Sequence, residues 1–82
     1  MTREEIINQL TPIAREIFAK PELIVTDDLS YENLDTWTSM AFMQFLTAIE
    51  EHFGFKYKMM EIIRLQNMKA VILSIQNHID NA

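Results

Sequence analysis

Apolar residues recur at the spacing of an α-helix in three separate stretches of this 82-residue chain, over about residues 2–18, 39–53 and 67–79. Each stripe has to be buried against another element, so three stripes in one short chain require helices that pack on one another. The chain has one Gly, two Pro and no Cys, so helix breakers are few and no disulfide framework replaces an apolar core. The pattern predicts an all-α fold, a small four-helix bundle formed by a single domain over residues 1–82.

The first helix is predicted from Thr2 to Phe18, because Thr2 and Glu5 have the spacing of a capping box. Pro12 falls inside the apolar pattern and removes one intrahelical N–H, which predicts a kink. In the alternative, Thr11 caps a second helix that restarts at Pro12.

Residues 19–38 form a long connection that is rich in turn-forming residues. Connections of this length are uncommon and are often functional. We expect this one to wrap the bundle, because it carries apolar residues that need burial: Leu23, Val25, Leu29, Leu34 and Trp37.

The second long helix is predicted from Ser39 to Phe53 and should end at Gly54, a residue suited to the left-handed turn after a helix. A short helix is predicted around Met59 to Leu65. Asn67 should cap the last helix. Two sets of residues should face the core: Phe42, Phe45, Leu46, Ile49 and Phe53 from the second helix, and Met68, Val71, Ile72, Ile75 and Ile79 from the last.

A second face of the helix at 39–53 carries residues of another kind. Methionines at helical spacing fill cores as often as they form binding surfaces, but these lie off the phenylalanine stripe. We interpret them as a partner-binding strip with acids at its far end: Met40, Met43 and Thr47, then Glu50 and Glu51, with Gln44 beside them.

Charge is unevenly distributed along the chain. Residues 21–55 contain seven acids and no Lys or Arg, whereas the chain as a whole has a net charge of −5. This segment is unsuited to nucleic acid, which needs clustered cations, and it favours a partner with a basic protein surface. In the alternative, these acids only keep a small domain in solution.

Ser39 follows the acidic connection and precedes the apolar run, at the predicted start of a helix. The free N–H groups and the dipole of a helix N-terminus favour a phosphate there. A serine in this position can also be an ordinary helix-capping residue.

Together these segments resemble an acyl carrier protein. That family places a phosphopantetheine-bearing serine in Asp-Ser-Leu or Asp-Ser-Met at the start of its second helix, before an apolar helix that ends in acids, Phe and Gly. Here residues 37–40 (WTSM) and 45–55 (FLTAIEEHFGF) match that arrangement. Residues 26–29 (TDDL) resemble the family's acidic loop, and residues 61–68 with the closing apolar helix resemble its third and fourth helices.

The resemblance implies a bundle of acyl-carrier type, with a long loop between the first two helices and a short third helix. It implies that Ser39 carries 4′-phosphopantetheine beside Thr38, and that the thiol of this group holds an acyl group as a thioester. The chain itself would not be an enzyme. Its partners would be a phosphopantetheinyl transferase and acyl-loading and acyl-transfer enzymes with basic surfaces, as in fatty acid biosynthesis.

The chain departs from the family pattern at several positions. Thr38 stands where the family nearly always has Asp, whose carboxylate lies close to the phosphate and to the transferase's metal-bound coenzyme A. Ala41 and Gln44 replace frequent acids, and Lys56 and Lys58 follow the helix where many relatives are acidic. Two alternatives stay open. One is a carrier-fold interaction module that is not phosphopantetheinylated. The other is a helical regulatory or structural protein unrelated to carriers, which a fold without the long loop and the short third helix would support.

Other site types find little support in the sequence. His52 and His78 are isolated, so we expect both on helix surfaces and predict no metal site. The acids at 27–32 lack the alternation and central Gly of a calcium loop. Ser39 has no G-x-S-x-G setting that would make it a catalytic nucleophile. With no signal peptide or membrane span in view, we expect a cytoplasmic monomer.

Overall fold

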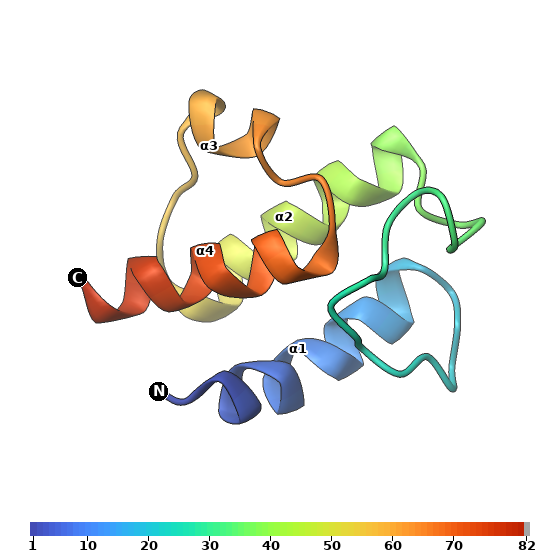
Figure 1. The fold of residues 1–82 in the computed structure, drawn as a ribbon, viewed down its shortest axis with the longest axis horizontal. Coiled ribbons are helices and arrows are strands. Elements are labelled where there is room, and N and C mark those ends of the chain that lie inside the picture. Colours follow the sequence, from blue (N-terminus) through green and yellow to red (C-terminus); the bar gives the residue numbers. More distant parts are fainter. Residues whose placement is uncertain (82) are drawn as a thin grey trace.

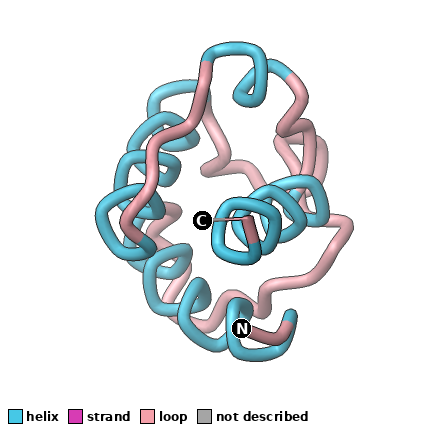
Figure 2. Tube along the Cα trace, turned by 90° about the vertical axis from the view of Figure 1, so that its left-hand side faces the viewer, coloured by secondary structure: helices cyan, strands magenta, loops and turns pink. Residues whose placement is uncertain are grey.

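The computed structural model describes residues 1–81 and contains four helices, α1 (Arg3–Ile17), α2 (Ser39–Phe53), α3 (Met59–Ile63) and α4 (Met68–Asp80) (Figure 1). No strand occurs within residues 1–81, so the predicted all-α class is confirmed. The three long helices pack together, with α1 in contact with both α2 and α4 (Figure 2). Within the described residues, no helix is both long and apolar enough to cross a bilayer.

The ends of the long helices follow the predicted signals. Thr2 Oγ1 accepts the N–H of Glu5, and the Glu5 carboxylate accepts the N–H of Thr2, which closes the capping box of α1. Asn67 caps α4 by accepting the N–H of Ala70 at 2.9 Å. Gly54 ends α2 in the left-handed region, with φ of 78°, where a residue without Cβ is unstrained.

The helix α1 continues through Pro12 without a restart. The hydroxyl of Thr11 donates to the carbonyl of Ile7, one turn earlier in the same helix, at 2.7 Å. Thr11 therefore does not act as the N-cap of a second helix. The alternative of two helices joined at Thr11 is therefore wrong.

Sixteen hydrophobic residues form the buried core. The predicted stripe of α2 is only partly within it, because Phe45, Leu46 and Ile49 are buried while Phe42 and Phe53 are half-buried at its ends. The predicted core of α4 is buried except for Ile79, which is half-buried near the end of the helix.

The connection 19–38 wraps the bundle as expected. Val25, Leu34 and Trp37 are buried, whereas Leu23 and Leu29 are only half-buried against the core. Trp37 stacks on Phe18 and on Phe42, with ring centroids 5.2 and 5.3 Å away. Backbone hydrogen bonds attach this connection to the start of α4, where the carbonyl of Leu29 accepts the N–H of Met68 at 2.8 Å. The residues that precede α2 are therefore held in place by apolar burial and by hydrogen bonds.

The helix α3 is shorter than predicted and has no fully buried residue. It ends at Ile63, with Arg64 as its C-cap, and the chain then turns so that Leu65 is buried outside the helix. The predicted end at Leu65 was therefore late, because the burial of that leucine is achieved in the connection to α4.

Candidate functional site

Ser39 is the first residue of α2, and its side chain is exposed. Thr38 precedes it as the N-cap: its Oγ1 accepts the N–H of Ala41 at 3.1 Å, and its carbonyl accepts the N–H of Phe42 at 2.8 Å. Hydrogen bonds within the described residues leave the N–H groups of Ser39 and Met40 unused. These two groups and the helix dipole provide an environment that suits a phosphate on Ser39.

The three serines of the chain differ sharply in their surroundings. Ser30 is buried, and its Oγ accepts the N–H of Glu32. Ser74 donates to the carbonyl of Val71 and lies 2.6 Å from the hydroxyl of Tyr57. Only Ser39 presents an exposed hydroxyl at the start of a helix, so it is the serine that a modifying enzyme can reach.

The segment before Ser39 limits where its hydroxyl can lie. Trp37 is buried, and its N–H donates to the carbonyl of Leu34 at 3.0 Å. The next N–H, that of Thr38, donates to the carbonyl of Thr36 at 2.9 Å. The chain therefore passes directly from a residue held in the core to the exposed head of α2.

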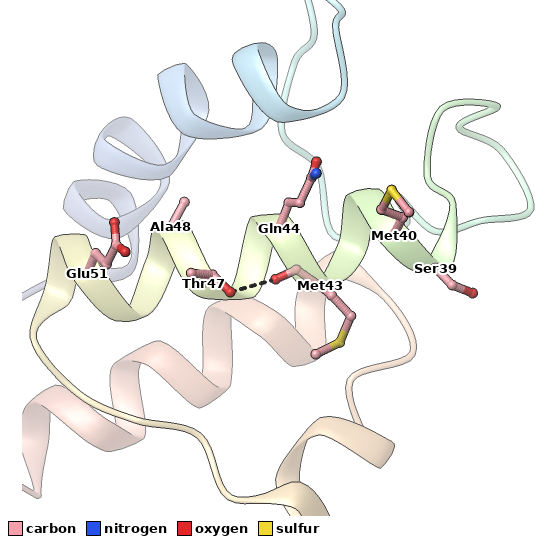
Figure 3. Close-up of a pocket in the computed structure, with 7 residues that line it drawn as sticks. All are labelled: Ser39, Met40, Met43, Gln44, Thr47, Ala48 and Glu51. Atoms are coloured by element: carbon pink, nitrogen blue, oxygen red, sulfur yellow. Dashed lines mark hydrogen bonds between the residues drawn. The ribbon is translucent and has the colours of Figure 1, made fainter.

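An open groove of about 590 Å³ begins at Ser39 and follows α2. Figure 3 shows Gln44 and Ala48 on one side of the helix and Met43 on the other, with Ser39 projecting from its start. The hydroxyl of Thr47 donates back to the carbonyl of Met43 at 3.0 Å, so Thr47 contributes mainly its methyl group to the surface. The groove is lined by Ser39, Met40, Met43, Gln44, Thr47, Ala48 and Glu51.

The two acids predicted at the far end of this strip have different surroundings. Glu51 is exposed and lines the groove. Glu50 is half-buried, and its carboxylate accepts the N–H of Tyr57 at 2.6 Å. Glu50 thus fixes the chain that follows α2, whereas Glu51 is free to face a partner.

Ala48 is a groove residue that the sequence prediction missed. It lies four residues after Gln44, which places both on the same side of the helix. Its helical spacing from Gln44 is the signal that could have found it.

His78 has a different position from the one predicted. It is half-buried, its ring stacks on that of Phe55 with centroids 4.2 Å apart, and its Nε2 lies 2.6 Å from Glu61 Oε2. The expected surface position is correct for His52, which is exposed and contacts Gln9, but wrong for His78. His78 instead joins α4 to α3.

The ionisable groups around His78 are shifted by identifiable contacts. The pKa of Glu61 is lowered, chiefly because its carboxylate accepts the backbone N–H of Lys58, with the His78 ring as a further cause. Burial raises the pKa of Tyr57 to about 12, and the charges of Glu61 and Glu50 act in the same direction. Within residues 1–81, no group of three His, Cys, Asp or Glu side chains is placed to hold a metal ion.

No protein-family model, curated protein or solved structure matches this chain. The fold and the site define a small all-α protein with an exposed serine at the head of a grooved helix.

Proposed function

We propose that this chain is an acyl-carrier-like protein in which Ser39 bears 4′-phosphopantetheine. The observation that carries the proposal is the position of Ser39: an exposed hydroxyl at the first residue of α2, two residues after the buried Trp37 and at the head of an open groove. The bound group would supply a thiol that holds an acyl group as a thioester. The role of the chain is then to present that group to enzymes.

The residues present fit the phosphate end of this group in two respects. The N–H groups of Ser39 and Met40 are unused at the start of α2, where such groups and the helix dipole favour a bound phosphate. Along the groove, the side chains of Met40, Met43 and Ala48 offer an apolar surface beside the attachment point.

A fold without the long loop and the short α3 would have favoured an unrelated helical protein, and both features are present. They support the carrier interpretation over that alternative. Thr38 is the observation that favours the other alternative, an interaction module that is never modified. Its hydroxyl caps α2 as an Asp would, but it brings no negative charge to a transferase's metal ion.

Partners of the carrier would be a phosphopantetheinyl transferase and acyl-loading and acyl-transfer enzymes with basic surfaces, acting on a cytoplasmic monomer. Their contact surface would be the groove of α2, with Met40, Met43 and Thr47 along it and Glu51 at its end. Glu50 is a weaker candidate for direct contact, because its carboxylate is already bonded to the N–H of Tyr57.

Intact-mass measurement after coexpression with a broad-specificity transferase tests the proposal. Wild type should gain one phosphopantetheine mass, and Ser39→Ala should gain none. Ser30→Ala is the matched control, because it removes a serine that is buried, and it should be modified like wild type if it stays folded.

The variant Thr38→Asp separates the two interpretations. If the missing carboxylate limits modification, Thr38→Asp should be modified faster than wild type. Modification of neither protein by several transferases would reject the carrier and favour the unmodified module. Modification that persists in Ser39→Ala would reject the assigned site.

A further inference from the structure

One face of α3 exposes three large apolar side chains. Met59, Met60 and Ile63 are 72%, 64% and 59% exposed. Their spacing of one and four residues places them on one side of the helix, while Glu61 and Ile62, between them in sequence, are half-buried on the other side. The helix α3 lies at the upper edge of the molecule both in the ribbon (Figure 1) and in the perpendicular view (Figure 2).

Cations adjoin α3 in the sequence. Lys56, Lys58 and Arg64 lie within three residues of its ends and are exposed, whereas Lys69, also exposed, lies in the first turn of α4, where its N–H donates to the carbonyl of Asp27 at 3.1 Å. Within residues 1–81, ion pairs join Arg3 to Asp27 and Lys20 to Asp35, Glu61 contacts the ring of His78, and none of these contacts involves Lys56, Lys58, Arg64 or Lys69.

The one acid between these cations is turned away from the exposed face. Glu61 Oε1 accepts the N–H of Lys58 at 2.9 Å, and its Oε2 lies 2.6 Å from His78 Nε2 on α4. Residues 56–64 therefore expose three cations and three large apolar side chains, in a protein whose net charge is −5.

We propose that this α3 surface, formed by Met59, Met60 and Ile63 with the neighbouring Lys56, Lys58 and Arg64, docks on an anionic lipid surface. Apolar side chains surrounded by Lys and Arg are the arrangement with which peripheral proteins enter the headgroup region. The unbranched methionines adapt to a disordered environment. The acidic segment 21–55 would be repelled by the same lipids, so the protein would dock with α3 facing the bilayer.

Flotation of the unmodified full chain with lipid vesicles tests this surface independently of Ser39. The protein should bind vesicles that contain phosphatidylglycerol but not pure phosphatidylcholine vesicles, and added salt should weaken the binding. Lys56→Gln with Lys58→Gln should weaken it by about fivefold per cation, and Met59→Ser with Met60→Ser should also reduce it.

Matched controls distinguish the α3 surface from general effects. Met40→Ser removes a methionine of similar exposure, 74%, from α2 and should leave lipid binding unchanged. Arg3→Gln with Lys20→Gln makes the same change in net charge elsewhere and should weaken binding less than the Lys56 and Lys58 changes do. Ser39→Ala should bind like wild type, so failure of the carrier proposal would not affect this result.

Three results would overturn the proposal. The first is no binding to anionic vesicles, and the second is equal loss of binding in the α3 variants and their controls. The third is binding of soluble polyglutamate through α3 with no binding of vesicles, which would assign the surface to an acidic protein partner.

Discussion

The helices α2 and α3 both expose methionines, but they are held in different ways. α2 has 15 residues and buries Phe45, Leu46 and Ile49 in the core. α3 has 5 residues and buries none of them fully. Its side-chain contacts are the packing of half-buried Ile62 against the core and the bonds of Glu61 to the N–H of Lys58 and the ring of His78, and the carbonyl of Ile63 accepts the side-chain N–H of Gln66.

The difference indicates where the molecule is rigid and where it can open locally. An element held by apolar burial is released only when the core unfolds, whereas one held by exposed polar contacts can open at small free-energy cost. Ser39 therefore lies on an element that holds it in a defined position, and the α3 surface lies on one that can adapt to what it meets. Three predictions test this contrast.

The largest effect is expected from truncating α2 in the core. Phe45→Ala should lower the free energy of unfolding by about 3–5 kcal/mol, because it leaves a cavity against Phe18, whose ring centroid lies 5.0 Å from that of Phe45. The measurement is urea unfolding followed by circular dichroism. Phe45→Leu should lower the free energy of unfolding by less, and it allows the measurement if the alanine variant does not fold.

The matched variant on α3 is Met60→Ala, which removes an exposed side chain. Its unfolding free energy should lie within about 0.5 kcal/mol of the wild-type value. A loss from Met60→Ala as large as that from Phe45→Ala would show that α3 is part of the core after all, and the contrast between the two helices would fail.

The next effect concerns Tyr57, in the connection between α2 and α3. It is 9% exposed, and its pKa is raised from 10.0 to about 12. The folded state keeps the Tyr57 phenol protonated to higher pH than the unfolded state does. The contribution of Tyr57 to the free energy of unfolding is therefore complete below pH 10 and is lost as the pH rises through about 12. Across this range, denaturant unfolding should show that wild type loses about 2–3 kcal/mol more of its unfolding free energy than Tyr57→Phe does.

A direct titration accompanies this measurement. The chain has two tyrosines, so Tyr31→Phe leaves Tyr57 as the only phenol. Its phenolate absorbance should develop near pH 12. Ionisation near pH 10, or equal alkaline destabilisation of wild type and Tyr57→Phe, would mean that the link between α2 and α3 is open to water.

Much of the fold could be predicted because its signals are local. Thr2, Asn67 and Gly54 mark helix ends through their own side chains or backbone freedom, and the apolar spacing of α2 identified Phe45 as a core residue. The accessible position of Ser39 could be predicted in the same way, from the residues immediately around it.

The contacts that join separate elements could not be predicted. Glu50 bonds to an N–H seven residues later, and Glu61 meets His78 seventeen residues later. No periodicity encodes such pairs, since they depend on where the chain returns after Gly54 and Leu65. For this reason two side chains that looked like surface groups, Glu50 and His78, are half-buried.

The smallest effect is expected from neutralising Glu61, and it should be confined to α3. Glu61→Gln keeps an oxygen for the N–H of Lys58 but removes the charge that faces His78. Hydrogen bonds and ion pairs of partly exposed side chains contribute about 1 kcal/mol, so hydrogen exchange of the α3 amides should rise by at most about fivefold, with α4 unchanged. Because folding lowers the Glu61 pKa below 4.5, acidification through that lowered value should produce the same opening in wild type.

Asp35→Asn is the control for this last effect. Asp35 also has a lowered pKa, caused by its hydrogen bond with Lys20, but it lies in the connection 19–38. It should leave exchange in α3 unchanged, because the charge it removes belongs to the loop and not to the α3–α4 contact. Equal exchange in wild type and Glu61→Gln at every pH would mean that Ile62 and the chain connections alone hold α3. In that case α2 and α3 would differ in length and not in the kind of contact that holds them.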